Sequence, residues 1–155
     1  MHSHISDDLL YAHADSVIDL AISNVSAGGL PFSAIIVNQS GNIIGKGVNQ
    51  VASQLDCTAH AEIQAIRDAS QNEKTASLKG TTLIASGEPC ALCYMAIRVA
   101  GIMKVLFISD RHDAEKHSFD YLWTYKYLKN ELFSDVKATQ LQHDRKLLPF
   151  QIAET

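Results

Sequence analysis

The chain has few cysteines, few prolines and no long apolar segment. Three cysteines among 155 residues are too few for a disulfide framework, and two of them share one short motif, so we expect a metal site in a cytoplasmic protein. No apolar run approaches the roughly 20 residues that a membrane-spanning helix needs, so we expect no membrane partner. The amino terminus lacks a basic segment followed by an apolar one, which argues against a signal peptide.

An excess of positive charge is also missing. The formal net charge is −4 and the isoelectric point is about 5.9, which argues against a nucleic-acid-binding protein. Hydrophobic residues make up 46% of the chain and charged residues 19%, as in an ordinary globular protein. The length suffices for a core without disulfide staples, and we expect one domain over residues 1–155.

Hydrophobic periodicity predicts alternating helices and strands, with a hairpin around the turn at residues 39–42. Thr58 is the expected cap of the second helix, and residues 50–57 and 70–79 are expected to be loops. The expected helices cover 7–27, 59–69, 90–100 and 120–132, and the expected strands cover 32–37, a segment starting at 43, 81–85, 104–108 and 136–141. The alternation after Thr58 implies right-handed crossovers between parallel strands, and therefore an α/β fold with a mixed sheet and helices on both faces.

Two short motifs carry the chemistry. His60 and Glu62 form a His-x-Glu pair, and Cys90 and Cys93 belong to a later Pro-Cys-x-x-Cys segment. One imidazole and two thiolates are three of the four ligands of a tetrahedral Zn²⁺, and a catalytic zinc keeps its fourth position for water. Cys90 and Cys93 are i and i+3 at a helix start, where the helix dipole favours thiolate, so both sulfurs can face one point. This signature is characteristic of zinc-dependent base deaminases.

Glu62 is free to move protons because it is not needed as a ligand. We expect it to take a proton from water, pass it to a ring nitrogen of the substrate and protonate the leaving amine. The alternative is a purely structural zinc site with Cys57 as fourth ligand, which would give Glu62 no role. Glu88, directly before the Pro-Cys pair, is expected either to bind an imidazole or a backbone amide, or to be a solvated loop carboxylate.

These motifs resemble the cytidine deaminase superfamily over nearly the whole chain, and several segments look most like the bacterial guanine deaminases. The segments that carry the resemblance are residues 30–34, 47–49, 58–62, 88–90, 113–115, 119–120 and 149–151. The resemblance implies a three-layer α/β/α fold with a five-stranded mixed sheet. It also implies a homodimer with an exchanged carboxy-terminal segment.

The resemblance also implies the roles of individual residues. One Zn²⁺ per chain would be held by His60, Cys90 and Cys93, with Glu62 as the proton shuttle. The substrate would contact the side chains of residues that the motifs place near the base: Phe32, Asn49, Ala61, Asp120 and Tyr121.

Two features depart from the guanine deaminase pattern. That pattern has a second acid where this chain has Tyr121, which leaves Asp120 as the nearest carboxylate. The chain also stops five residues after Phe150, so the lid of the pocket is expected to be absent, shorter or supplied by Trp123 and its aromatic neighbours.

The leading interpretation is a zinc-dependent aminohydrolase that converts a free nucleobase or similar heterocyclic amine, with guanine to xanthine and ammonia as the first candidate. The alternatives are a tRNA adenosine deaminase, which shares both motifs, and a cytosine deaminase. A non-catalytic zinc-stabilised binding subunit is the alternative from another class, and Glu62 argues against it.

Overall fold

The computed structural model describes residues 5–127 and 135–155. The helices are α1 (Asp7–Ser26), α2 (Val51–Gln54), α3 (Ala61–Glu73), α4 (Ala91–Ala100), α5 (Arg111–Lys116), the 3-10 helix η1 (Leu122–Tyr127) and α6 (Leu148–Ala153). The strands are β1 (Ser33–Val37), β2 (Ile43–Val48), β3 (Thr82–Gly87), β4 (Lys104–Ser109) and β5 (Lys137–Gln140). None of the helices in these ranges is long and apolar enough to cross a membrane.

The five strands form one mixed sheet in the order β2-β1-β3-β4-β5. Strand β1 is antiparallel to both β2 and β3, whereas β3, β4 and β5 are parallel. The predicted hairpin and the predicted parallel strands are both confirmed. Each parallel connection brings the chain back to the same edge of the sheet, so the segments that leave β3 and β4 lie side by side.

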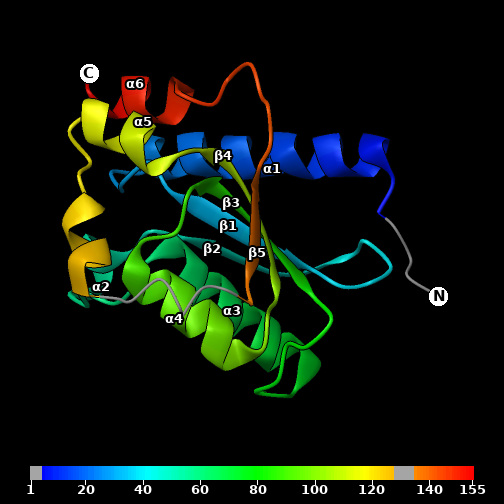
Figure 1. Cartoon of the computed structure of the whole chain (residues 1–155). Coiled ribbons are helices and arrows are strands. Elements are labelled where there is room, and N and C mark those ends of the chain that lie inside the picture. Colours follow the sequence, from blue (N-terminus) through cyan, green and yellow to red (C-terminus); the bar gives the residue numbers. More distant parts are fainter. Residues whose placement is uncertain (1–4, 128–134) are drawn as a thin grey trace.

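Helices cover both faces of the sheet, with α1 on one side and α3 and α4 on the other (Figure 1). Side chains alternate along β1, as expected for a strand buried on both faces. Ile35 and Val37 pack in one cluster with Val17 and Ile18 of α1, while Ile36 packs in a second cluster with residues of α3 and α4. This confirms the three-layer α/β/α fold.

Five local expectations are wrong. Thr58 does not cap α3, because its hydroxyl donates to Asp56 and the cap position falls to His60. The expected loop at residues 50–57 contains α2, and α3 continues four residues beyond the expected end at 69. The expected helix at 120–132 is a short 3-10 helix as far as Tyr127, and its remainder lies outside the described residues. The expected tail forms α6, in which Pro149 occupies the first turn, where proline is tolerated, and Phe150 is buried.

Two glycines allow β2 to lie directly against α3. A Cβ atom at Gly47 would lie 2.2 Å from the carbonyl oxygen of Ala61 and 2.4 Å from the amide nitrogen of Ala65. A Cβ atom at Gly45 would lie 2.6 Å from the amide nitrogen of Ala69. All three neighbours are backbone atoms of α3, which cannot turn aside as a side chain can. The absence of a side chain at these positions therefore sets the position of α3 and of Glu62 in its first turn.

We expect the substitution Gly47→Ala to lower the free energy of unfolding by about 1–3 kcal/mol, because the added methyl group would push α3 away from the sheet. Urea denaturation followed by circular dichroism measures the change. Lys46→Ala is the matched control, since Lys46 lies on the same strand with an exposed side chain. Equal stability of the Gly47 variant and the wild type would contradict this account of the packing.

Candidate zinc-dependent active site

Two of the three expected zinc ligands occupy helix cap positions. His60 is the N-cap residue of α3, with φ −68° and ψ 156°, and Cys90 is the N-cap residue of α4, with φ −71° and ψ 173°. Neither side chain makes a capping hydrogen bond, so both are free to point at a common centre. Cys93 lies one turn into α4 on the same side. The structure thus brings together the two halves of the motif, which are 30 residues apart in the chain.

The spacing of the three side chains fits a tetrahedral zinc ion. His60 Nδ1 lies 3.5 Å from Cys90 Sγ and 3.4 Å from Cys93 Sγ, and the two sulfurs are 3.7 Å apart. Tetrahedral Zn²⁺, with bonds of about 2.3 Å to sulfur and about 2.05 Å to nitrogen, requires about 3.8 Å between sulfurs and about 3.6 Å between sulfur and nitrogen. Among the described residues, these three form the group whose ligand atoms lie close enough to hold a metal ion.

Hydrogen bonds within this group shift the pKa values of its side chains. The hydrogen bond between the two thiols lowers the pKa of Cys90 to about 4, with a further contribution from His60. The same hydrogen bond, together with burial, raises the pKa of Cys93 well above its ordinary value. The hydrogen bond to Cys90 is the main cause that raises the pKa of His60. Cys90 is therefore the more acidic thiol of the pair, and binding of a dication favours the loss of both thiol protons.

Glu62 is buried in the first turn of α3 beside this cluster. The Cys93 thiol donates to Glu62 Oε2 at 3.3 Å, so the carboxylate lies next to the ligands without being one of the three. Burial is the main cause that raises the pKa of Glu62 to about 7, and the negative charge of Cys90 acts in the same direction. A buried carboxyl group that can take and release a proton near neutral pH is suited to general acid-base chemistry.

A cavity of about 330 Å³ opens above the cluster. Its wall contains Glu62 and the ligands His60 and Cys90, together with each residue expected to contact a substrate: Phe32, Asn49, Ala61, Asp120 and Tyr121. Cys93 is fully buried behind this wall. Cys57 is exposed at the cavity and is not part of the three-residue ligand group, as expected for a residue near the pocket mouth.

Asn49 lines the cavity and is held in place by its neighbours. Its side-chain oxygen accepts from the amide of Val51 at 3.2 Å, and its backbone is held by Phe32 and Asn24. A side-chain amide carries both donors and acceptors, which suits hydrogen bonds to the edge of a heterocyclic base.

Aromatic rings form the opposite side of the cavity. Phe32 packs edge-on against Phe119, Tyr121 and Phe150, with ring centroids 6.0, 6.2 and 5.6 Å apart. Phe150 of α6 is buried, so the carboxy-terminal segment contributes a ring to the support of this wall. Trp123, by contrast, is 55% exposed and packs against Tyr127, so it does not form a lid over the cavity.

The two residues at the departure from the guanine deaminase pattern are both engaged within the chain. The Tyr121 hydroxyl donates to the carbonyl oxygen of Glu88 at 2.5 Å, and burial raises the pKa of this phenol well above its usual range. Asp120 Oδ1 accepts from the amide of Leu122 at 2.9 Å. Both residues line the cavity.

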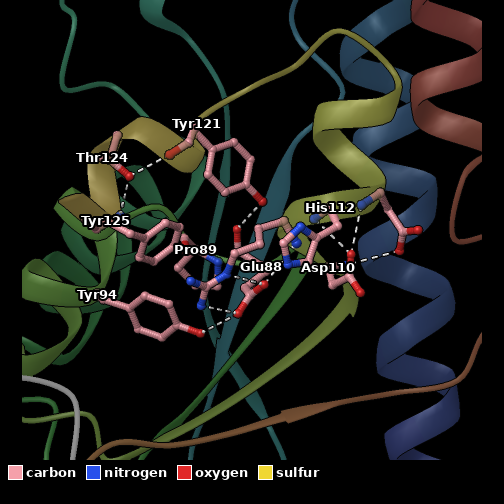
Figure 2. A network of polar contacts seen from close by, with 11 residues as sticks. Glu88, Pro89, Tyr94, Asp110, His112, Tyr121, Thr124 and Tyr125 are labelled. Carbon is pink, nitrogen blue, oxygen red and sulfur yellow. Dashed lines mark hydrogen bonds and ion pairs between the residues drawn. The ribbon is translucent and has the colours of Figure 1, made fainter. Parts of the chain in front are cut away.

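Glu88 is the centre of a polar network behind the site (Figure 2). Its carboxylate accepts from the backbone amide of Arg111 at 2.9 Å and also from the Arg111 guanidinium. The bond to a backbone amide agrees with the first of the two expectations for Glu88. Sequence reasoning could not identify Arg111 as the partner of Glu88, because the two residues are 23 positions apart in the chain. Only the position of Glu88 next to the Pro-Cys pair could have directed attention to it.

Residues 9–109 match the family described as the cytidine and deoxycytidylate deaminase zinc-binding region. The chain belongs to this family. The match includes all three expected ligands and Glu62, so zinc is the cofactor of the site and a zinc-dependent deaminase is its enzyme class.

Relatives of two activities are similar to the chain. The guanine deaminase of Bacillus subtilis is 40% identical over 110 residues, which are 70% of each chain. Its crystal structure superposes with a TM-score of 0.73 and 33% identity, covering 95% of this chain and 92% of that one. The tRNA-specific adenosine deaminase of Buchnera aphidicola is 44% identical over 92 residues, which are 59% of this chain and 60% of the relative. The chain thus spans less than two thirds of this last relative.

A solved guanine deaminase from Nitrosomonas europaea has the same fold, with a TM-score of 0.81 at 23% identity over 99% of this chain and 96% of that one. The family and these structures confirm the expected cytidine deaminase-like fold.

We expect purified protein to hold one zinc ion per chain, and we expect Cys57→Ser to leave this ratio unchanged because Cys57 is outside the ligand group. Cys93→Ser should lower the ratio towards zero, since a hydroxyl group is a poor replacement for a thiolate. Elemental analysis after gel filtration measures the ratio. Loss of zinc from the Cys57 variant would instead support the structural four-ligand site.

Proposed function

We propose that the protein is a zinc-dependent hydrolytic deaminase of a free nucleobase, with guanine as the first candidate substrate. The observation that carries the proposal is the position of Glu62, a buried carboxyl group at a small cavity beside three side chains spaced as zinc ligands. A binding subunit held together by zinc would have no use for such a group. The cavity volume is at the lower end of the roughly 300–1,000 Å³ of small-molecule sites, which suits a single base.

Different residues would bind the metal, transfer protons and orient the substrate. His60, Cys90 and Cys93 would hold the zinc ion, which when bound would lower the pKa of a water molecule towards about 7 and so make hydroxide available at neutral pH. Glu62 takes one proton of the attacking water and delivers it to the adjacent ring nitrogen; it then takes the remaining hydroxyl proton of the tetrahedral adduct and passes it to the departing amine. The carbon gains an oxygen atom and loses ammonia, so an amino-substituted ring becomes a carbonyl-substituted one. Asn49 and the edge of Phe32 orient the base while this occurs.

The guanine proposal is supported by the similarity to the guanine deaminase of B. subtilis over most of both chains. It is also supported by the position of Asn49 in the cavity wall, since a side-chain amide can form hydrogen bonds to the polar edge of guanine. We further propose a homodimer in the cytoplasm, as the resemblance implies.

A tRNA adenosine deaminase is the second candidate, because the Buchnera relative with that activity is 44% identical over the matched residues. The net charge of −4 disfavours it, since phosphate binding depends on clustered Lys and Arg. The proposal for a free base would fail if the protein bound a tRNA anticodon stem-loop with an affinity that falls steeply with added salt.

We expect zinc-loaded protein to release ammonia from guanine in a panel with guanosine, adenine, cytosine, cytidine and a tRNA anticodon stem-loop. Coupled ammonia detection measures the rates. Turnover of another panel member alone would keep the zinc chemistry but replace guanine as the substrate. No turnover of any member by zinc-loaded protein would contradict the proposed activity on these substrates.

We expect Glu62→Gln to lower kcat by about 10²–10⁴-fold while one zinc ion per chain is retained, because the amide keeps the shape but cannot carry the proton. Glu73→Gln is the matched control, an exposed glutamate at the end of the same helix. Unchanged turnover in Glu62→Gln would overturn its role as the proton shuttle.

A further inference from the structure

Side chains from a distant segment hold the backbone that precedes the zinc ligand Cys90. The Tyr121 hydroxyl donates to the Glu88 carbonyl, and the Tyr125 hydroxyl donates to the Pro89 carbonyl. Both tyrosines lie more than 30 positions along the chain from their acceptors. The turn that delivers Cys90 is therefore fixed by contacts with the segment that also forms part of the cavity wall.

The start of α4 is held in the same way. Its first amide, that of Ala91, donates to Thr124 Oγ1 at 3.1 Å. Thr124 Oγ1 in turn donates to the carbonyl oxygen of Tyr121 at 2.7 Å. A residue of η1 thus performs the capping that the side chain of Cys90 does not provide.

One ion pair, in which Glu88 is buried and Arg111 is partly exposed, joins these contacts. Glu88 Oε1 accepts from the Arg111 backbone amide at 2.9 Å and from Nε at 3.0 Å, and Oε2 accepts from Nη2 at 2.8 Å. Tyr94 of α4 donates to Oε2 at 3.4 Å. The Arg111 guanidinium lies 3.6 Å from the centre of the Tyr125 ring, so the same cation supports a tyrosine that holds Pro89.

We propose that the Glu88–Arg111 pair is a positioning device that sets the place of the ligand Cys90 and of the cavity wall at Tyr121 together. Glu88 immediately precedes the ligand turn, and Arg111 begins α5 after β4, so the pair ties two neighbouring connections at one edge of the sheet. The flat guanidinium suits both tasks, because it bonds the carboxylate with two N–H groups and stacks on the tyrosine ring. This inference shares one premise with the proposed function, namely that the site binds a zinc ion.

The test compares the zinc affinity of Glu88→Gln and Arg111→Met with that of the wild type, by competition with a chromogenic chelator. We expect dissociation constants about 10–100-fold higher in both variants, the usual effect of losing a group that orients a ligand. We also expect the visible absorption bands of the cobalt-substituted variants to shift, because these bands report the geometry of the ligands and not merely the stability of the fold.

Arg98→Met is the matched control. Arg98 belongs to α4 and forms an ion pair of the same length with Asp135, 2.8 Å, but both partners are exposed. Should Arg111→Met fail to fold because it leaves a buried carboxylate unpaired, Glu88→Gln carries the test, since it removes that charge and keeps the shape.

Wild-type zinc affinity and an unaltered cobalt spectrum in folded Glu88→Gln would overturn the proposal, and so would an equal loss of affinity in Arg98→Met. None of these measurements needs a substrate. A protein that turns over no amine but loses zinc affinity in the two variants would therefore contradict the proposed function and still support the positioning device.

Discussion

The site depends on two helices that begin at the same edge of one sheet. The parallel order of β3 and β4 places the start of α4 at that edge, and the contact of β2 with α3 places His60 and Glu62 opposite it. The second contact requires glycine, because the backbones of β2 and α3 are closer than any side chain would permit. Local rules for helices and strands thus form the elements, while a close approach between backbones decides whether the ligands meet.

The sequence predicted the ligands and the shuttle because their spacing is local. Cys90 and Cys93 are one helical turn apart, and Glu62 follows His60 within the same turn, so residue type and spacing together indicate the chemistry. The hairpin and the parallel neighbours followed from the alternation of elements and the handedness of crossovers, although the order of all five strands was not predicted. The sheet and the centre of the site were therefore within reach of sequence reasoning.

The contacts between distant segments could not be predicted from the sequence. Nothing in the residues around Arg111 indicates that it pairs with Glu88, and nothing around Thr124 indicates that it caps α4. The segment beyond Asp120, expected to be an α-helix, is a 3-10 helix up to Tyr127, and the hydroxyls of Tyr121 and Tyr125 donate to the backbone of Glu88 and Pro89, contacts that no local pattern indicates. Thr58 was the expected cap by residue type alone, whereas the position of His60 at the helix start follows from the backbone path after α2.

The N-cap positions of His60 and Cys90 have a thermodynamic consequence. Most helices gain about 1 kcal/mol from a Ser, Thr, Asp or Asn side chain at this position, and neither residue makes such a bond here. A metal ion that binds both side chains ties the two helix starts to each other. Zinc binding and the folding of the first turns of α3 and α4 are therefore linked equilibria. A change that destabilises these turns also lowers the affinity for zinc.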